Sequence, residues 1–192
     1  MKPLLLIAGL LFGSRVLAAP TVVFSKVEIV ELDSGKTVDA PNDPAKAAFV
    51  AAVKHDLGHP APFASPFKLS SPPEWGRTVP GSSGKIEFHD RFPGGFFVRV
   101  NLEGLTPDHR YRLTLNGNPK LAGNDRLADP VPGLPAERYF DFFTATTDAK
   151  GNYQGTFGIA LSPGPYDVRF YVKDTDDFKI VLYHDYFKFT VE

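Results

Sequence analysis

The sequence contains no cysteine, and this absence removes several kinds of protein chemistry. Without thiols the chain has no disulfide framework, no thiolate nucleophile and no cysteine-ligated zinc or iron–sulfur site. An excess of one charge is lacking as well, since 21 basic and 22 acidic residues give a formal net charge of −1. The basic surface typical of a nucleic-acid-binding protein is therefore missing, and we expect no nucleic-acid partner.

Long hydrophobic runs are confined to the N-terminus. A positive charge at Lys2 precedes the apolar run 4–12, and a Val-Leu-Ala sequence shortly afterwards offers a cleavage site. This pattern is typical of a secretory signal peptide, and its apolar run is shorter than the about 20 residues that span a bilayer. We therefore expect residues 1–18 to be a signal peptide and residues 19–192 to be one secreted or periplasmic domain with no membrane span.

Alternation of apolar and polar residues dominates the second half of the chain, residues 85–192. Such a period of two indicates strands with one buried face, and the intervening Pro-Gly and Asp-rich segments are typical turns. The prediction is an all-β fold, an antiparallel β-sandwich. The segments with this alternation are 86–88, 96–102, 111–115, 139–147, 153–161, 166–172, 178–184 and 187–191.

The first part of the domain, residues 19–84, is expected to hold one strand, one short helix and a long Pro-rich loop. Apolar residues over 22–30 predict the strand. Asp43 followed by proline is typical of a helix N-cap and first helical position, and Gly58 marks the predicted helix end.

The Pro-rich stretch 59–80 contains six prolines, so we predict a loop rather than a regular element. Large apolar residues such as Phe63 and Phe67 favour a loop wrapped over the domain. Trp75, the single tryptophan, has two interpretations. It either pins this loop to the core or lies exposed on the sandwich, where it could stack against a sugar ring.

The segment Leu-Thr-Pro-Asp-His-Arg-Tyr, from Leu105 to Tyr111, resembles the Leu-x-Pro-x-x-x-Tyr segment of fibronectin type III and other immunoglobulin-like domains. The resemblance implies a tyrosine corner. In such a corner the Tyr111 hydroxyl would bond back to the backbone between Leu105 and Pro107, where a chain crossing between sheets leaves backbone groups unpaired.

A second resemblance joins Thr-Asp-Ala-Lys-Gly-Asn-Tyr, which contains Asp148 and Gly151, to Leu-Ser-Pro-Gly-Pro-Tyr from Leu161. Together they look like the pattern of transthyretin-like and carboxypeptidase regulatory-domain modules. We expect Asp148 to bond the backbone of its own turn and Gly151 to adopt positive φ. The implied fold is an immunoglobulin-like or transthyretin-like sandwich that binds or braces, with no catalytic residue carried over.

Histidines and aspartates supply an alternative hypothesis. His89 and His184 each precede an aspartate, but neighbours on a strand point to opposite faces and form no local dyad. With His109, these histidines could converge with aspartates on a transition metal, as in a metal-dependent enzyme. Asp174 and Asp176 crowd one turn and could bind calcium, although a solvated hairpin tip is the better explanation, since the full calcium-loop pattern is absent.

The prediction for function is a secreted, non-catalytic β-sandwich with a binding or structural role. We expect no cofactor, with calcium or a transition metal as the alternative. The expected partner is a protein or a carbohydrate at the cell surface. A third hypothesis gives the aromatic-rich strand 187–191 an open edge that adds to the sheet of a partner.

Overall fold

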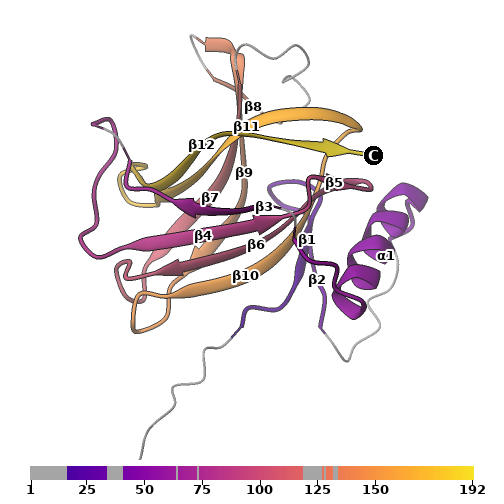
Figure 1. Cartoon of the computed structure of the whole chain (residues 1–192), viewed down its shortest axis with the longest axis horizontal. Helices are drawn as coiled ribbons and strands as arrows, with labels where there is room; N and C mark the ends of the chain where they lie inside the picture. The colour runs from indigo at the N-terminus through magenta and orange to yellow at the C-terminus, as the bar shows by residue number, and fades with distance from the viewer. Residues whose placement is uncertain are drawn as a thin grey trace, which may run out of the picture.

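Two sheets packed face to face form the body of the chain in the computed structural model, which describes residues 17–33, 41–63, 65–72, 74–118, 127, 129–131 and 134–192 (Figure 1). The predicted mainly β, sandwich-like fold with one helix is confirmed. Sheet 1 has the order β2 (Ile29–Glu31), β1 (Thr21–Val23), β10 (Tyr153–Ala160), β6 (Gly95–Glu103), β4 (Ser83–Phe88), β3 (Ser65–Leu69). Sheet 2 has the order β5 (Arg91–Phe92), β12 (Ile180–Val191), β11 (Gly164–Asp174), β7 (Arg110–Gly117), β9 (Leu134–Thr146), β8 (Asp129–Val131).

The strand pairs are mostly antiparallel, as the alternation predicts. Two short strands depart from this rule, since β1 pairs with β10 and β5 pairs with β12 in parallel. Among the described residues, no helix is long and apolar enough to cross a membrane.

The main core lies between the two sheets and is built from alternate residues of each strand. On β6, the four residues Phe96, Val98, Val100 and Leu102 are completely buried, while Arg99 between them is partly exposed. Removing these side chains from water supplies the main driving force for packing the two sheets.

The helix α1 (Pro44–Gly58) begins and ends where the sequence predicts. The Asp43 carboxylate accepts a hydrogen bond from the Ala45 N–H at 2.9 Å and so caps the helix. The buried Phe49 and Val53 pack in a second, smaller core on the outer side of sheet 1, beside β1 and β10 (Figure 1). Gly158 permits this close approach, because a Cβ there would lie 2.6 Å from a methyl carbon of Val53.

The single strand expected over residues 22–30 is instead a hairpin of β1 and β2. The turn contains neither glycine nor proline, which is why the sequence did not reveal it. The Ser25 hydroxyl makes the turn by accepting hydrogen bonds from the N–H groups of Val27 and Glu28, at 3.4 and 3.1 Å.

The prediction that the whole Pro-rich stretch is irregular is wrong, because β3 lies within it. Pro66 is tolerated there since β3 is an edge strand that pairs only with β4 among the described strands. The chain beyond β3 follows the sandwich. Ser70 exchanges backbone hydrogen bonds with Tyr183, at 2.8 and 2.9 Å, and the Arg77 N–H donates to the Ile180 carbonyl at 2.8 Å.

The two strands expected at 178–184 and 187–191 are one strand, β12, interrupted by a bulge opposite Arg169. The hypothesis of an open edge at 187–191 is not supported. This segment pairs with β11, the two residues at its end also pair with β5, and Phe187 and Phe189 are buried.

Aromatic residues on apparently opposite faces of β9 are explained by a bulge. The pairing with β7 shifts between Leu113 and Thr114, so that Phe142 has no residue opposite it. Phe142 consequently lies in the core and the partly buried Phe143 packs against it. Asp141 points to the other side, where it bonds to Thr114.

Candidate functional site

The outer face of sheet 2, the face turned away from the core, carries a continuous set of polar and aromatic side chains. Cross-strand register places them side by side, since Arg112 lies opposite Lys173 and Thr114 opposite Tyr171. The alternate residues of the same strands, such as Leu113 and Val172, are in the core. The members of this outer face are Arg112, Thr114, Asn116, Tyr139, Asp141, Arg169, Tyr171, Lys173 and Tyr183.

Asp141 is the centre of the charged part of the outer face. Its Oδ1 accepts hydrogen bonds from Thr114 Oγ1 and Lys173 Nζ, both at 2.6 Å, and its Oδ2 accepts one from Arg112 at 3.1 Å. Burial raises the pKa of the Asp141 carboxyl, but the hydrogen bonds and charge of Lys173, with those of Thr114 and Arg112, outweigh burial and hold the pKa below its ordinary value. The carboxylate is therefore charged at neutral pH and fully engaged.

A depression of about 340 Å³ opens beside this carboxylate. Arg112 and Asp141 form part of its wall, and Lys26 and Ile29 of the β1–β2 hairpin form another part. The depression thus lies where the hairpin of sheet 1 meets the outer face of sheet 2.

Aromatic rings occupy the neighbouring part of the outer face. Trp75, from the loop after β3, packs edge-on against Tyr171 and Tyr183, with ring centroids 6.0 and 5.8 Å apart. It nevertheless keeps 49% of its surface exposed. Trp75 thus packs on the sheet, as the first interpretation of the sequence predicts, and also presents part of its ring to solvent, as the second predicts.

A second exposed aromatic residue, Phe178, lies in the turn between β11 and β12. The Arg112 guanidinium lies over its ring at 5.3 Å from the centroid, and 58% of the residue is exposed. Among the large hydrophobic residues that the described chain exposes, Trp75 and Phe178 are the aromatic ones. Both contact the same face of the sandwich.

Fixed polar groups continue the outer face beyond the aromatic rings. The buried Tyr171 hydroxyl bonds to Asn116 Oδ1 and to the Arg169 guanidinium, each at 3.2 Å. Arg169 also pairs with Asp185 at 3.1 Å and lies over the ring of Tyr186. These bonds hold the planar groups in set positions.

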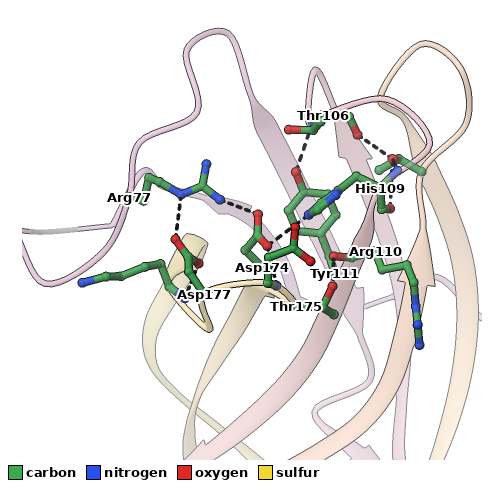
Figure 2. A network of polar contacts seen from close by, with 11 residues as sticks. Arg77, Thr106, His109, Arg110, Tyr111, Asp174, Thr175 and Asp177 are labelled. Atoms are coloured by element: carbon green, nitrogen blue, oxygen red, sulfur yellow. Dashed lines mark hydrogen bonds and ion pairs between the residues drawn. The ribbon is translucent and has the colours of Figure 1, made fainter.

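A separate polar network closes one end of the sandwich (Figure 2). Asp174, only 3% exposed, pairs with Arg77 and lies 3.0 Å from His109 Nε2, while Arg77 also pairs with Asp177 at 3.3 Å. Burial raises the pKa of Asp174, but the bonds from the Asp176 backbone and His109, with the nearby positive charges, hold it below its ordinary value. The network ties the Pro-rich loop to the β11–β12 turn.

Three of the five predicted metal candidates come together in this network. Ligand atoms of His109, Asp174 and Asp176 lie within 4.8 Å of one another. However, Asp174 Oδ1 already accepts hydrogen bonds from the Asp176 N–H and from His109, and Arg77 holds the other oxygen. The bonds made by Asp174 are those of a structural clamp.

The other two candidate histidines lie elsewhere and do not join the cluster. His89 stacks on Phe63 at 4.7 Å between ring centroids, with its Nε2 3.2 Å from Asp56 of α1. His184 stacks on Phe67 of β3 at 4.2 Å. Both rings serve packing, which is a common role for a histidine beside aromatic residues.

The segments that carried the family resemblances pack on each other. The Tyr111 hydroxyl accepts a hydrogen bond from the Thr106 N–H at 3.1 Å, the bond that a tyrosine corner requires (Figure 2). Asp148 accepts bonds from two backbone N–H groups of its own turn. Gly151 adopts a φ of 76° against Leu105, where a Cβ would lie 1.9 Å from the Leu105 carbonyl oxygen. Pro107 lies in the exposed loop of the corner.

A larger, mainly apolar groove of about 930 Å³ lies between the β1–β2 hairpin, the start of α1 and the loop after β10. Phe24, Val27 and Phe49 contribute to its lining, and Lys46 pairs with Glu28 across it at 2.6 Å. The groove offers mainly apolar surface, whereas the outer face of sheet 2 combines aromatic rings with fixed polar groups.

Sequence reasoning singled out Trp75 but missed Asp141, Lys173 and Arg112. These three come from three strands, and no motif in the sequence connects them. No protein-family model, curated protein or solved structure matches the chain. Functional inference therefore rests on the fold and on the outer face itself.

Proposed function

We propose that this protein is an exported, non-catalytic carbohydrate-binding domain, and that the outer face of sheet 2 is its binding surface. The observation that carries the proposal is the exposure of Trp75 and Phe178 on one face that also bears fixed polar groups. The resemblance to immunoglobulin-like and transthyretin-like modules, which usually bind or brace, supports a binding role as well.

The chemistry of this face suits a sugar better than a wholly apolar ligand. A pyranose ring has an apolar C–H side, which stacks on an aromatic ring, and a rim of hydroxyl groups, which bond to planar polar side chains. Trp75 offers the ring. Arg169 offers hydrogen-bond donors, and its guanidinium bonds to the hydroxyl of Tyr171, the ring that Trp75 contacts. Because Tyr171 and its hydrogen bonds hold these groups in place, little side-chain entropy is lost on binding.

The backbone at Phe178 gives further support. Its φ of 58° lies in the left-handed region, which bulky residues seldom adopt. The chain thus holds a large aromatic ring in solvent through an unfavourable backbone conformation, and such residues cluster at functional sites.

A glycan-array screen of the purified protein, followed by calorimetric titration of each hit, tests the proposal. Trp75→Ala and Phe178→Ala should each weaken binding by about tenfold or more, since a stacked aromatic contact contributes roughly 1–3 kcal/mol. Val27→Ala is the matched control, because Val27 is 92% exposed on the β1–β2 hairpin and bears no ring. If no glycan on the array binds, or if Trp75→Ala binds a glycan as tightly as the unmodified protein does, a carbohydrate ligand on this face is contradicted.

A further inference from the structure

We propose that the depression beside Asp141 receives a carboxylate group of the bound carbohydrate, so that the ligand is an acidic glycan containing uronic acid residues. This inference rests on the proposed function and deepens it. Arg112 and Lys173 provide the positive charge for the carboxylate.

The charge balance of the depression differs from that of the whole chain. Among the described residues, the charged ones that line it are Arg112, Lys26 and Asp141. Lys173 adds a positive charge beside it through its hydrogen bond to Asp141. Arg112 and Lys173 together therefore outweigh the single negative charge of Asp141, although the chain has a formal net charge of −1.

The hydrogen-bonding capacity is also unequal. Asp141 accepts three bonds from side chains and has little capacity left. Arg112 uses one of its five N–H donors on Asp141, and the described part of the chain gives it no other hydrogen bond. Lys173 likewise spends one of its three on Asp141. Donors therefore remain for an anion, and guanidinium donors suit the two oxygens of a carboxylate.

Mutual repulsion among the cations agrees with this assignment. Burial lowers the pKa of Lys173 first, and the charges of Arg112 and Lys26 lower it further against the opposing effect of Asp141. A bound carboxylate would offset the repulsion between these cations. The volume of about 340 Å³ accommodates a group the size of one sugar residue.

The neighbouring aromatic rings connect the recess to the proposed glycan surface. Phe178 lies under the Arg112 guanidinium, and the Lys173 ammonium lies 4.9 Å from the ring centroid of Tyr139. A chain that stacks on an exposed ring can therefore place an acidic group beside the same cations.

Titration with polygalacturonate, with its fully methyl-esterified form and with neutral galactan tests the inference. The acidic polymer should bind more tightly than its ester by about tenfold or more, and high ionic strength should reduce this difference. Arg112→Gln should reduce the preference for the acidic polymer over its ester by a similar factor. The ratio of the two affinities is the readout, because Arg112 also contacts the ring of Phe178. Sodium phosphate and acetate, added as competitors, separate recognition of any anion from recognition of the sugar acid.

Arg99→Gln is the matched control for Arg112→Gln. Arg99 lies on sheet 1, over the ring of Phe63 at 4.9 Å and 3.9 Å from Glu87, so it has a similar aromatic and carboxylate environment. Circular dichroism and thermal unfolding establish that both variants are folded.

The outcomes separate the two proposals. If the acid and its ester bind equally and Trp75→Ala abolishes both, the carboxylate assignment fails and the carbohydrate function stands. Full displacement of the acidic polymer by phosphate at comparable concentration would also overturn it in favour of a general anion site. If none of the three polymers binds and the glycan array is silent, both proposals fail.

Discussion

Two tyrosines whose hydroxyl groups are shielded from water allow the contribution of the Tyr111 hydrogen bond to stability to be measured. The same substitution, tyrosine to phenylalanine, can be made at both positions. Tyr111 is fully buried and its hydroxyl accepts the Thr106 N–H. The Tyr153 hydroxyl is also shielded from water, but no hydrogen-bond partner for it is present in the part of the chain that the structure describes. Its burial raises the pKa of Tyr153 well above the ordinary value, as expected for a phenol in apolar surroundings.

Tyr111→Phe should destabilise the protein by about 1 kcal/mol, because one hydrogen bond is lost and the exposed Thr106 can be hydrated. For a chain of this length, that corresponds to a fall in Tm of about 2–4 °C. Tyr153→Phe should be neutral or stabilising by up to about 1 kcal/mol, because it removes an unpaired buried hydroxyl.

Equilibrium unfolding in urea, with thermal unfolding as a second measurement, gives both values. The difference between the two variants is the informative quantity, since the loss of one oxygen atom is common to both. Equal destabilisation by the two substitutions would refute the reasoning, because the corner bond would then contribute nothing beyond packing.

Two further predictions concern the charged centre and the helix. Asp141→Asn leaves the mostly buried Lys173 without its counter-charge and should destabilise by about 2–4 kcal/mol at neutral pH. The pKa of Asp141 in the folded protein lies below its ordinary value of 3.8. Asp141 therefore stabilises the folded protein above pH 3.8, and this stabilisation is lost as the pH falls through the folded pKa. Urea unfolding at several pH values should show that the variant lacks this part of the loss of stability in acid. Gly158→Ala places a Cβ 2.6 Å from Val53 and should destabilise by about 1–3 kcal/mol, with faster amide exchange in α1. Gly58→Ala, which meets nothing within 4 Å, should leave unfolding and exchange nearly unchanged, and an equal loss there would argue against close helix–sheet packing as the cause.

The sandwich could be predicted from the sequence because its cause is local. Each strand of the second half shows its buried face through alternation, as the core residues of β6 illustrate. The helix start was equally visible, since Asp43 and Pro44 carry their own capping chemistry. The turns at Asp148 and Gly151 were predicted for the same reason.

Elements whose boundaries depend on distant partners were predicted less well. The β1–β2 turn relies on a serine hydroxyl rather than on glycine or proline. Strand β3 holds a proline because it lies at a sheet edge, and the sequence does not show which strands are edges. Strand β12 is continuous and contains a bulge. In the sequence, the interruption of the alternation at this bulge resembles a turn between two strands.

The candidate site was predicted least, since it is a product of strand register. The site is built from three charged residues on three different strands, Arg112, Asp141 and Lys173. In the sequence, each of them has the pattern of an ordinary exposed strand residue. Only the order β11–β7–β9 brings them into contact. Trp75 was noticed because it is unique in the chain, but its contact with Tyr171 and Tyr183 depends on how the Pro-rich loop follows β12.

The bulge at Phe142 affects both the local strand pattern and the cross-strand contacts of the candidate site. Without the extra residue, strict alternation from Asp141 would place Phe143 on the outer face, and its ring would leave the core. With the bulge, Phe142 stays in the core and the partly buried Phe143 packs against it, while Asp141 keeps its place beside Thr114 and Lys173. The same irregularity therefore keeps both rings against the apolar core and leaves the Asp141 carboxylate in the wall of the depression. A local departure from the strand pattern is thus what allows a stable sandwich to present a charged recess on its surface.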